Sequence, residues 1–189
     1  MSYTYYNCYN LTGSPVCGNE VITMHYTYYN CSKLNGAPVC GDKVTDMYRT
    51  YRDCSNLRGA PVCGNKVTNM CQTYWNCYNL TGAAVMGANV INARAAYENC
   101  YNLTGTPKLS LKCTDFNFTY HGCEKLTGSP VTSETVTGMR YTYAGCLQLT
   151  GRPVIGNNVV EADFSYYLCP NLTQGPIIGA KVTNLYYAF

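Results

Sequence analysis

The chain has 189 residues, only 12% of them charged, and its formal net charge at pH 7 is +3. That charged fraction is about half the usual one for soluble domains. Lys and Arg are spread along the chain and form no basic patch, which argues against nucleic acid as a partner. No apolar run approaches the roughly 18–20 residues of a membrane-spanning helix, so membrane insertion is not expected. Met1 leads directly into a repeat, so we expect a chain that lacks a secretory leader or is a processed piece.

One unit of 23 residues is repeated along the whole chain, first as MSYTYYNCYNLTGSPVCGNEVIT over residues 1–23. Eight units, which we call coils one to eight, fill residues 1–184, and residues 185–189 begin a ninth. No unit gains or loses a residue. A fixed period of about 20–50 residues is typical of solenoids, in which each repeat stacks on its neighbours. The sequence therefore predicts a single solenoid domain over residues 1–189.

The first half of each coil carries apolar residues at fixed positions. The first position is always apolar, the fifth is Tyr, the eighth is Cys and the eleventh is Leu, as in Met1, Tyr5, Cys8 and Leu11. The last three of these lie three residues apart, which predicts a short helical or 3₁₀ turn with one face in the core. A buried Tyr should find a hydrogen-bond partner for its hydroxyl group.

The second half of each coil contains a corner and two short apolar runs. Gly13 and Pro15 mark the corner, and Val16–Cys17 and Val21–Thr23 are predicted to be short strands. Each strand should pair in parallel with the same strand of the next coil, with the proline at a strand start. In coil five the alternation of residues 107–113 instead predicts one longer strand, whose inward residues are Leu109, Leu111 and Cys113.

Thirteen cysteines would normally suggest disulfides or a metal site. Eight of them stand at the repeat period, and a second row that begins with Cys17 continues as Met, Leu, Thr and Ile, so these residues act as small apolar side chains. Parallel stacking about 4.8 Å apart also suits a disulfide poorly. We expect reduced, mostly buried thiols and no metal site. Cys71 lies outside both rows, and we expect it at the surface.

The pattern M-x-x-T-Y-x-N-C-x-x-L-x-x-x-P-V-x-x-x-x-V-T-x resembles the BspA-type leucine-rich repeat. Thr4-Tyr5 stands for the Ala-Phe of that family, and Cys8, Leu11 and Val21 match its Cys, Leu and Val. Pro15 precedes the strand residues instead of following them, so the second half of the coil can follow a different path. The resemblance covers all eight coils. It implies an all-β-leaning, right-handed solenoid without enzymatic activity, of the kind found on bacterial and protist surfaces and, in Tyr- and Asn-rich variants, in phages.

Aromatic and charged residues mix in the third, sixth and ninth positions of the coils, so these rows should lie at the surface. Tyr, Trp and Arg are favoured in binding surfaces, although stacked rows could instead serve only to stabilise the ladder. The candidate binding residues are Tyr3, Tyr6, Tyr9, Tyr26, Tyr29, Arg49, Arg52, Trp75, Tyr78, Tyr101, Phe118, His121, Tyr141, Phe164 and Tyr167.

No cluster of His, Ser, Cys and acidic residues suggests catalysis, and we expect no cofactor. We expect a non-enzymatic scaffold for recognition or adhesion that binds a protein or glycan, on a phage particle or a bacterial surface. The alternative is a structural subunit that stacks end to end into a filament. A bare terminal coil exposes its core and its unpaired strand edge, and Leu185–Phe189 restarts the repeat without completing it.

Overall fold

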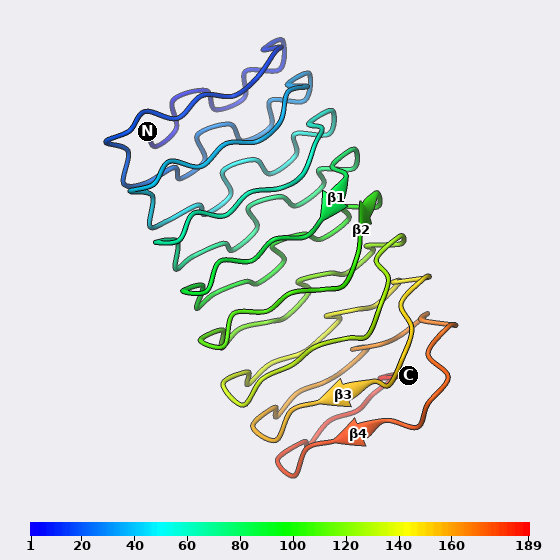
Figure 1. Ribbon diagram of the computed structural model, residues 1–189. Helices are drawn as coiled ribbons and strands as arrows, with labels where there is room; N and C mark the ends of the chain where they lie inside the picture. The colour runs from blue at the N-terminus through cyan, green and yellow to red at the C-terminus, as the bar shows by residue number, and fades with distance from the viewer.

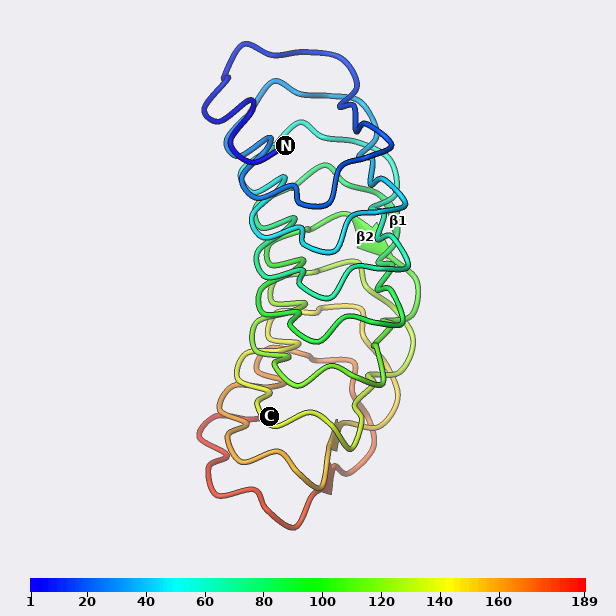
Figure 2. The same cartoon turned by 90° about the vertical axis from the view of Figure 1, so that its left-hand side faces the viewer.

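The computed structural model describes residues 1–189 and shows the chain as a series of turns stacked along one direction, with the termini at opposite ends (Figure 1). Figure 2 shows the same stack from the side. Isolated parallel bridges join residues that hold the same position in consecutive coils, from Thr23↔Asp46 through to Glu161↔Asn184. Each 23-residue repeat is therefore one turn of the stack.

Regular secondary structure is sparse. Strands β1 (Gly82–Ala83) and β2 (Leu103–Thr104) pair in parallel, as do β3 (Val154–Ile155) and β4 (Ile177–Ile178). Parallel pairing between coils is confirmed, but only β3 and β4 lie at the predicted Val16–Cys17 position, and β1 and β2 lie at other positions and pair two residues out of the repeat register. The strands are only two residues long, and the predicted helical turns are absent. No helix in the structure has the length and apolar character to cross a membrane.

The backbone of the first half of each coil explains why no helix forms. The third and seventh positions have left-handed φ angles, for example 51° at Tyr26 and 57° at Asn30, and such residues end a right-handed helix. In positions one to eight, N–H groups at even positions close short turns, as Cys31 does by donating to the carbonyl of Tyr28 (3.1 Å). Those at odd positions donate to the next coil, as Tyr28 does to Thr50 (2.9 Å). The bonds between coils thus replace a helical ladder.

The core contains the residues that the repeat pattern places inward. In the interior coils the Tyr, Cys and Leu rows are buried, for example Tyr74, Cys77 and Leu80. The Tyr74 ring stacks on that of Tyr51 at 5.5 Å. The hydroxyl of Tyr74 donates to the carbonyl of Val62 (2.7 Å) and accepts from its N–H group (3.1 Å). The predicted burial and the predicted partner for the hydroxyl are both confirmed.

Coil five differs from the prediction in its second half. Residues 107–113 form no strand, and the side chain of Leu111 is 78% exposed, so its inward assignment is wrong. The N–H group of Cys113 donates to the carbonyl of Ser110 (3.0 Å), as Val21 does to Gly18 (3.1 Å) in coil one. The tight turn of the other coils is thus retained here, and Leu111 lies at its exposed tip.

All thirteen cysteines are free thiols in the structure and none is exposed. The thiol of Cys77 donates to the carbonyl of Tyr51 in the preceding coil (3.0 Å), and the other interior members of the row repeat this bond. The expectation that Cys71 lies at the surface is wrong, because its residue is only 8% exposed. Its small side chain lies in the second-position row, where the residues of the two neighbouring coils are the larger Tyr48 and Arg94.

We expect thiol titration of the denatured, non-reduced protein to find close to thirteen thiols per chain. The reason is that the eighth-position thiols from Cys31 onward bond to main-chain carbonyls of the coil before them, as Cys54 does to Tyr28 (2.9 Å), and not to another sulfur. A chain reduced before denaturation is the control. Intact mass that reveals six disulfides would contradict the prediction.

Candidate functional site

Two columns of aromatic side chains run along one face of the N-terminal coils. The third-position rings of Tyr3 and Tyr26 stack at 4.8 Å, with an angle of 12° between their planes. The sixth-position rings of Tyr6 and Tyr29 stack at 5.0 Å and 10°. Tyr3 also contacts Tyr6 at 5.7 Å, so the two columns form one surface. Tyr3 and Tyr6 are 55% and 43% exposed.

Two arginines continue these columns into coil three. The guanidinium group of Arg52 lies 3.9 Å from the centre of the Trp75 ring and 5.6 Å from that of Tyr29. Arg49 lies 5.4 Å from the Tyr26 ring and donates to its hydroxyl (2.6 Å). An arginine over an aromatic face is attracted by the ring quadrupole, so the cations are held in place within the columns.

Two residues absent from the sequence prediction complete this group. The Tyr48 ring lies 4.9 Å from the Arg49 guanidinium, and burial raises the pKa of its hydroxyl. The side-chain carbonyl of Gln72 accepts hydrogen bonds from Arg49 and from Arg52 (3.1 Å). We call the following set the N-terminal aromatic cluster: Tyr3, Tyr6, Tyr26, Tyr29, Tyr48, Arg49, Arg52, Gln72 and Trp75.

A second group of stacked rings lies on the C-terminal coils. Phe118 stacks on Tyr141 (4.9 Å), Tyr141 on Phe164 (4.5 Å) and Phe164 on Tyr187 (5.4 Å). His121 meets Tyr141 edge to face at 5.7 Å. We call the following set the C-terminal aromatic cluster: Phe118, His121, Tyr141, Phe164, Tyr167, Tyr186 and Tyr187. Tyr186 and Tyr187 were not among the residues predicted from the sequence.

Coil five separates the two clusters. Its third position is the buried Ala95, and its sixth is Glu98, whose carboxylate lies 3.2 Å from Nδ1 of His121. Arg94 lies 5.4 Å from the ring of Phe118. The face therefore carries two aromatic clusters with a smaller, more polar interval between them. The sequence predicted continuous third-position and sixth-position rows along the chain and did not indicate this division.

Three predicted residues of the ninth position lie apart from both clusters. Tyr78 and Tyr101 stack on each other at 5.1 Å, and the exposed Tyr9 has no aromatic neighbour. None of the three contacts a ring of either cluster. The candidate surface thus reduces to the third and sixth positions, together with second-position residues such as Tyr48.

The third-position backbone does not depend on the aromatic side chain. Arg49, Gln72 and Ala95 have φ angles of 53°, 58° and 52°, close to the 57° of Tyr3 and the 51° of Tyr26. The left-handed region costs a residue with a Cβ atom about 1–2 kcal/mol. An aromatic ring therefore is not required for the repeat to form at this position.

The stacking decides which part of each ring is accessible. Rings that lie about 5 Å apart in nearly parallel planes cover one another's faces, as do Tyr6 and Tyr29 (5.0 Å). Arg52 covers one face of Trp75. Along the columns the ring edges and phenol hydroxyl groups remain accessible, together with the outer faces of Tyr3 and Tyr6, which have a stacked ring on one side only.

The chemistry of the thiols is that of buried apolar groups. Burial raises the pKa of Cys71 to about 11, which keeps its sulfur protonated at neutral pH, whereas a nucleophile needs the thiolate. The structure contains no group of three or more His, Cys, Asp or Glu residues that could hold a metal ion.

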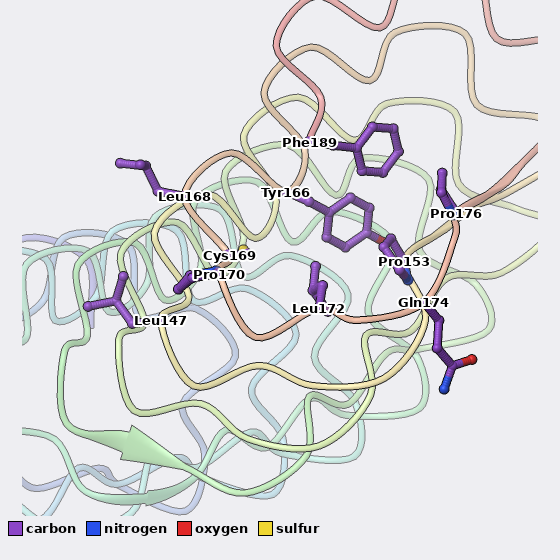
Figure 3. Close-up of a pocket in the computed structure, with 10 residues that line it drawn as sticks. All are labelled: Leu147, Pro153, Tyr166, Leu168, Cys169, Pro170, Leu172, Gln174, Pro176 and Phe189. Atoms are coloured by element: carbon purple, nitrogen blue, oxygen red, sulfur yellow. The ribbon is translucent and has the colours of Figure 1, made fainter.

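An apolar cavity of about 550 Å³ lies at the C-terminal end of the stack (Figure 3). Tyr166, Cys169 and Leu172 line it from coil eight, and Phe189 lies beside Tyr166, with 5.8 Å between the ring centres. The position-equivalent residues in coils two to seven are buried by the coil that follows. The cavity is thus the part of the core of coil eight that no complete coil covers.

The chain matches no protein-family model, no curated protein and no solved structure. Its function therefore has to be inferred from the two aromatic clusters and from the open end of the core.

Proposed function

We propose that the protein is a non-enzymatic recognition scaffold, a leucine-rich-repeat-like solenoid of the BspA type, that binds a partner protein through its two aromatic clusters. The observation that carries this proposal is the concentration of exposed and half-buried aromatic and arginine side chains at positions where the repeat does not require them. Coil five has the same backbone with Ala95 in the third position. Tyr, Trp and Arg are also the residues that dominate binding energy in protein interfaces.

The accessible edges favour a protein over a glycan as the partner. Sugar rings pack on open aromatic faces, and the stacking of Tyr3 on Tyr26 (4.8 Å) leaves few such faces. Ring edges, phenol hydroxyls and ordered guanidinium groups match the mixture of apolar and polar groups on a protein surface. The setting that the repeat resemblance implies is a phage particle or a bacterial surface.

The test is the attachment of labelled protein to intact bacterial cells. The triple variant Tyr6→Ser, Tyr29→Ser and Trp75→Ser should lose attachment and keep a cooperative melting transition, because these side chains lie on the surface of the stack. The matched control changes Tyr9, Tyr78 and Tyr101 to Ser, which removes as many aromatic rings outside the clusters.

Treatment of the cells distinguishes the two kinds of partner. Protease digestion of the cell surface should abolish attachment of the unchanged protein, whereas periodate oxidation of glycans should not. Unchanged attachment of the triple variant, accompanied by a lower melting temperature, would show that the aromatic columns only stabilise the stack.

A second candidate function is that of a structural subunit that stacks end to end. The apolar cavity beside Tyr166, Leu172 and Phe189 favours it, because an uncovered core is a contact surface for a further coil. A contact between opposite ends of two copies is heterologous and extends into a filament unless it closes into a ring.

A further inference from the structure

The two arginines of the N-terminal aromatic cluster meet at one neutral oxygen. The side-chain carbonyl of Gln72 accepts a hydrogen bond from Nε of Arg49 and another from Nη1 of Arg52 (3.1 Å). Two guanidinium groups that share one acceptor atom lie close together, and their positive charges repel each other. The arrangement therefore favours a negatively charged group beside the pair.

Carboxylates of the chain compensate only part of this charge. A carboxylate oxygen of Asp53 lies 3.3 Å from Nε of Arg52. Arg49 forms no ion pair, because Asp46, close to it in the sequence, pairs instead with Nε2 of His25 (2.6 Å). The pair thus has two positive charges, held at fixed positions, and one carboxylate in contact with them.

Both arginines have N–H groups that bond to nothing in the chain. A guanidinium group has five N–H donors. Arg49 uses one for Gln72 and one for the hydroxyl of Tyr26 (2.6 Å). Arg52 uses one for Gln72 and one for Asp53 (3.3 Å). Neither arginine has a buried nitrogen without a partner, so the unused donors of both groups face solvent and can bind a ligand.

Aromatic rings hold the two guanidinium groups in position. Arg52 lies 3.9 Å from the centre of the Trp75 ring and 5.6 Å from that of Tyr29, which belong to the coils after and before it. Arg49 lies 4.9 Å from the centre of the Tyr48 ring. The rings cover faces of the guanidinium planes, so a ligand meets the N–H groups at the edges. Side chains that are already ordered lose less entropy on binding.

The aromatic surroundings favour a ligand of the same charge. Stacking leaves ring edges accessible, as for Tyr6 and Tyr29 (5.0 Å), and an aromatic edge carries the positive end of the ring quadrupole. Beside the C-terminal aromatic cluster one guanidinium nitrogen of Arg140 lies 3.0 Å from the carboxylate of Asp163, and another lies 3.5 Å from that of Glu161. A pair of arginines with surplus charge therefore occurs in the N-terminal aromatic cluster and not in the C-terminal one.

We propose that Arg49 and Arg52 bind the carboxylate of an Asp or Glu side chain on the partner protein, so that the N-terminal aromatic cluster recognises an acidic segment. The inference rests on the protein-binding function proposed above. A carboxylate is planar and accepts two parallel hydrogen bonds from one guanidinium group. Its single negative charge matches the one surplus positive charge of the pair, whereas a phosphorylated side chain carries about −1.5 to −2. Complementary charge also selects the partner and speeds association.

The fluorescence of Trp75 tests the site without the natural partner. Trp75 is the only tryptophan of the chain, and it lies on Arg52, so its emission reports on the pair. Titration of the full chain at constant ionic strength with a peptide of alternating Glu and Ala should give a saturable change in this emission. The counterpart with Gln in place of Glu should give none. A phosphoserine counterpart that binds more tightly than the Glu peptide would overturn the assignment to a carboxylate.

The double variant Arg49→Gln and Arg52→Gln should bind the Glu peptide at least about tenfold more weakly, because it loses the charged hydrogen bonds. It should keep a cooperative melting transition, since Gln72 already holds the third position of the next coil with a φ of 58°, close to the 53° of Arg49. The control Arg58→Gln and Arg152→Gln removes the same charge from two exposed arginines at other positions. Equal weakening in both double variants would show that net charge, and not the pair, attracts the peptide.

Attachment to bacterial cells separates this inference from the function it rests on. The double variant Arg49→Gln and Arg52→Gln should lose attachment, and so should the unchanged protein on cells whose carboxylates have been converted to neutral amides with carbodiimide and ethanolamine. If both attach normally while the triple aromatic variant does not, the carboxylate site is refuted and protein recognition stands. If the Glu peptide binds but the protein attaches to no cells, recognition of a cell-surface protein is refuted and the carboxylate site stands. The absence of any saturable change in Trp75 emission refutes the site.

Discussion

Raising the pH from about 8 to 11 should unfold the protein in a steep transition, because most of its thiols are buried in the folded state. Burial raises the pKa of Cys71 to about 11 and that of Cys113 to about 12. It raises the pKa of fully buried thiols such as Cys77 and Cys100 well above the ordinary range. In the unfolded chain a thiol titrates near pKa 8.5.

The sign of the effect follows from these directions. The folded state keeps its thiol protons when the unfolded chain has lost them, so the stabilisation is complete below about pH 8.5 and is lost as the pH rises toward the folded values. Each such thiol reduces the free energy of unfolding by about 1.4 kcal/mol per pH unit. Several acting together remove the ~5–15 kcal/mol of a typical domain within one or two pH units.

Urea denaturation at pH 7, 9, 10 and 11 with a reducing agent measures this dependence. The variant Cys77→Ala is the control, because the loss of one buried thiol should reduce the slope between pH 9 and 11 by about 1.4 kcal/mol per pH unit. Stability that stays level up to pH 10.5 would contradict the burial of the cysteine row.

Leu80→Ala should lower the free energy of unfolding by about 2–5 kcal/mol, the usual cost of truncating a buried leucine and leaving a cavity. Leu80 is fully buried in coil four, and so are the equivalent residues of the two neighbouring coils, Leu57 and Leu103. Thermal and urea melts of the variant measure the loss.

Leu111→Ala is the matched control, because it removes the same atoms from a side chain that is 78% exposed. We expect its effect to stay within about 0.5 kcal/mol, as for most surface substitutions. Equal losses in the two variants would mean that the eleventh position does not form the core.

The aromatic clusters combine two roles that these experiments separate. Stacked pairs such as Tyr141 and Phe164 (4.5 Å) stabilise the stack by about 0.5–1.5 kcal/mol each. Their accessible edges at the same time provide the proposed binding surface. A variant that loses binding without a matching loss of stability shows the second role.

The sequence by itself determined which residues form the core and how the repeats are related. The unbroken 23-residue period and the constant Tyr, Cys and Leu rows predicted the burial of Tyr74, Cys77 and Leu80 and the parallel pairing between coils. The physical reason is that equivalent residues of stacked repeats have equivalent surroundings. Eight copies of each position therefore distinguish inside from outside within a single chain.

Only the tertiary structure decided the path of the chain within a coil. Hydrogen bonds between coils, as from Tyr26 to Tyr48, hold the third and seventh positions at left-handed φ angles and so exclude the helical turn. Asn at the seventh position is a recognisable signal for this conformation, but Tyr or Phe at the third is not. The departures at Leu111 and Cys71 have the same origin, because the exposure of a side chain depends on turns and neighbours in other coils.

The arrangement of the candidate site was also decided by the tertiary structure. The sequence predicted Tyr6, Tyr29 and Tyr78 equally as binding residues, yet Tyr78 lies apart from the clusters, and Tyr48, which was not predicted, belongs to one. The repeat predicts which equivalent residues stack along the axis. Contact between two different rows depends on the direction in which the backbone points each side chain. That direction is set by the bonds between coils, which no single repeat contains.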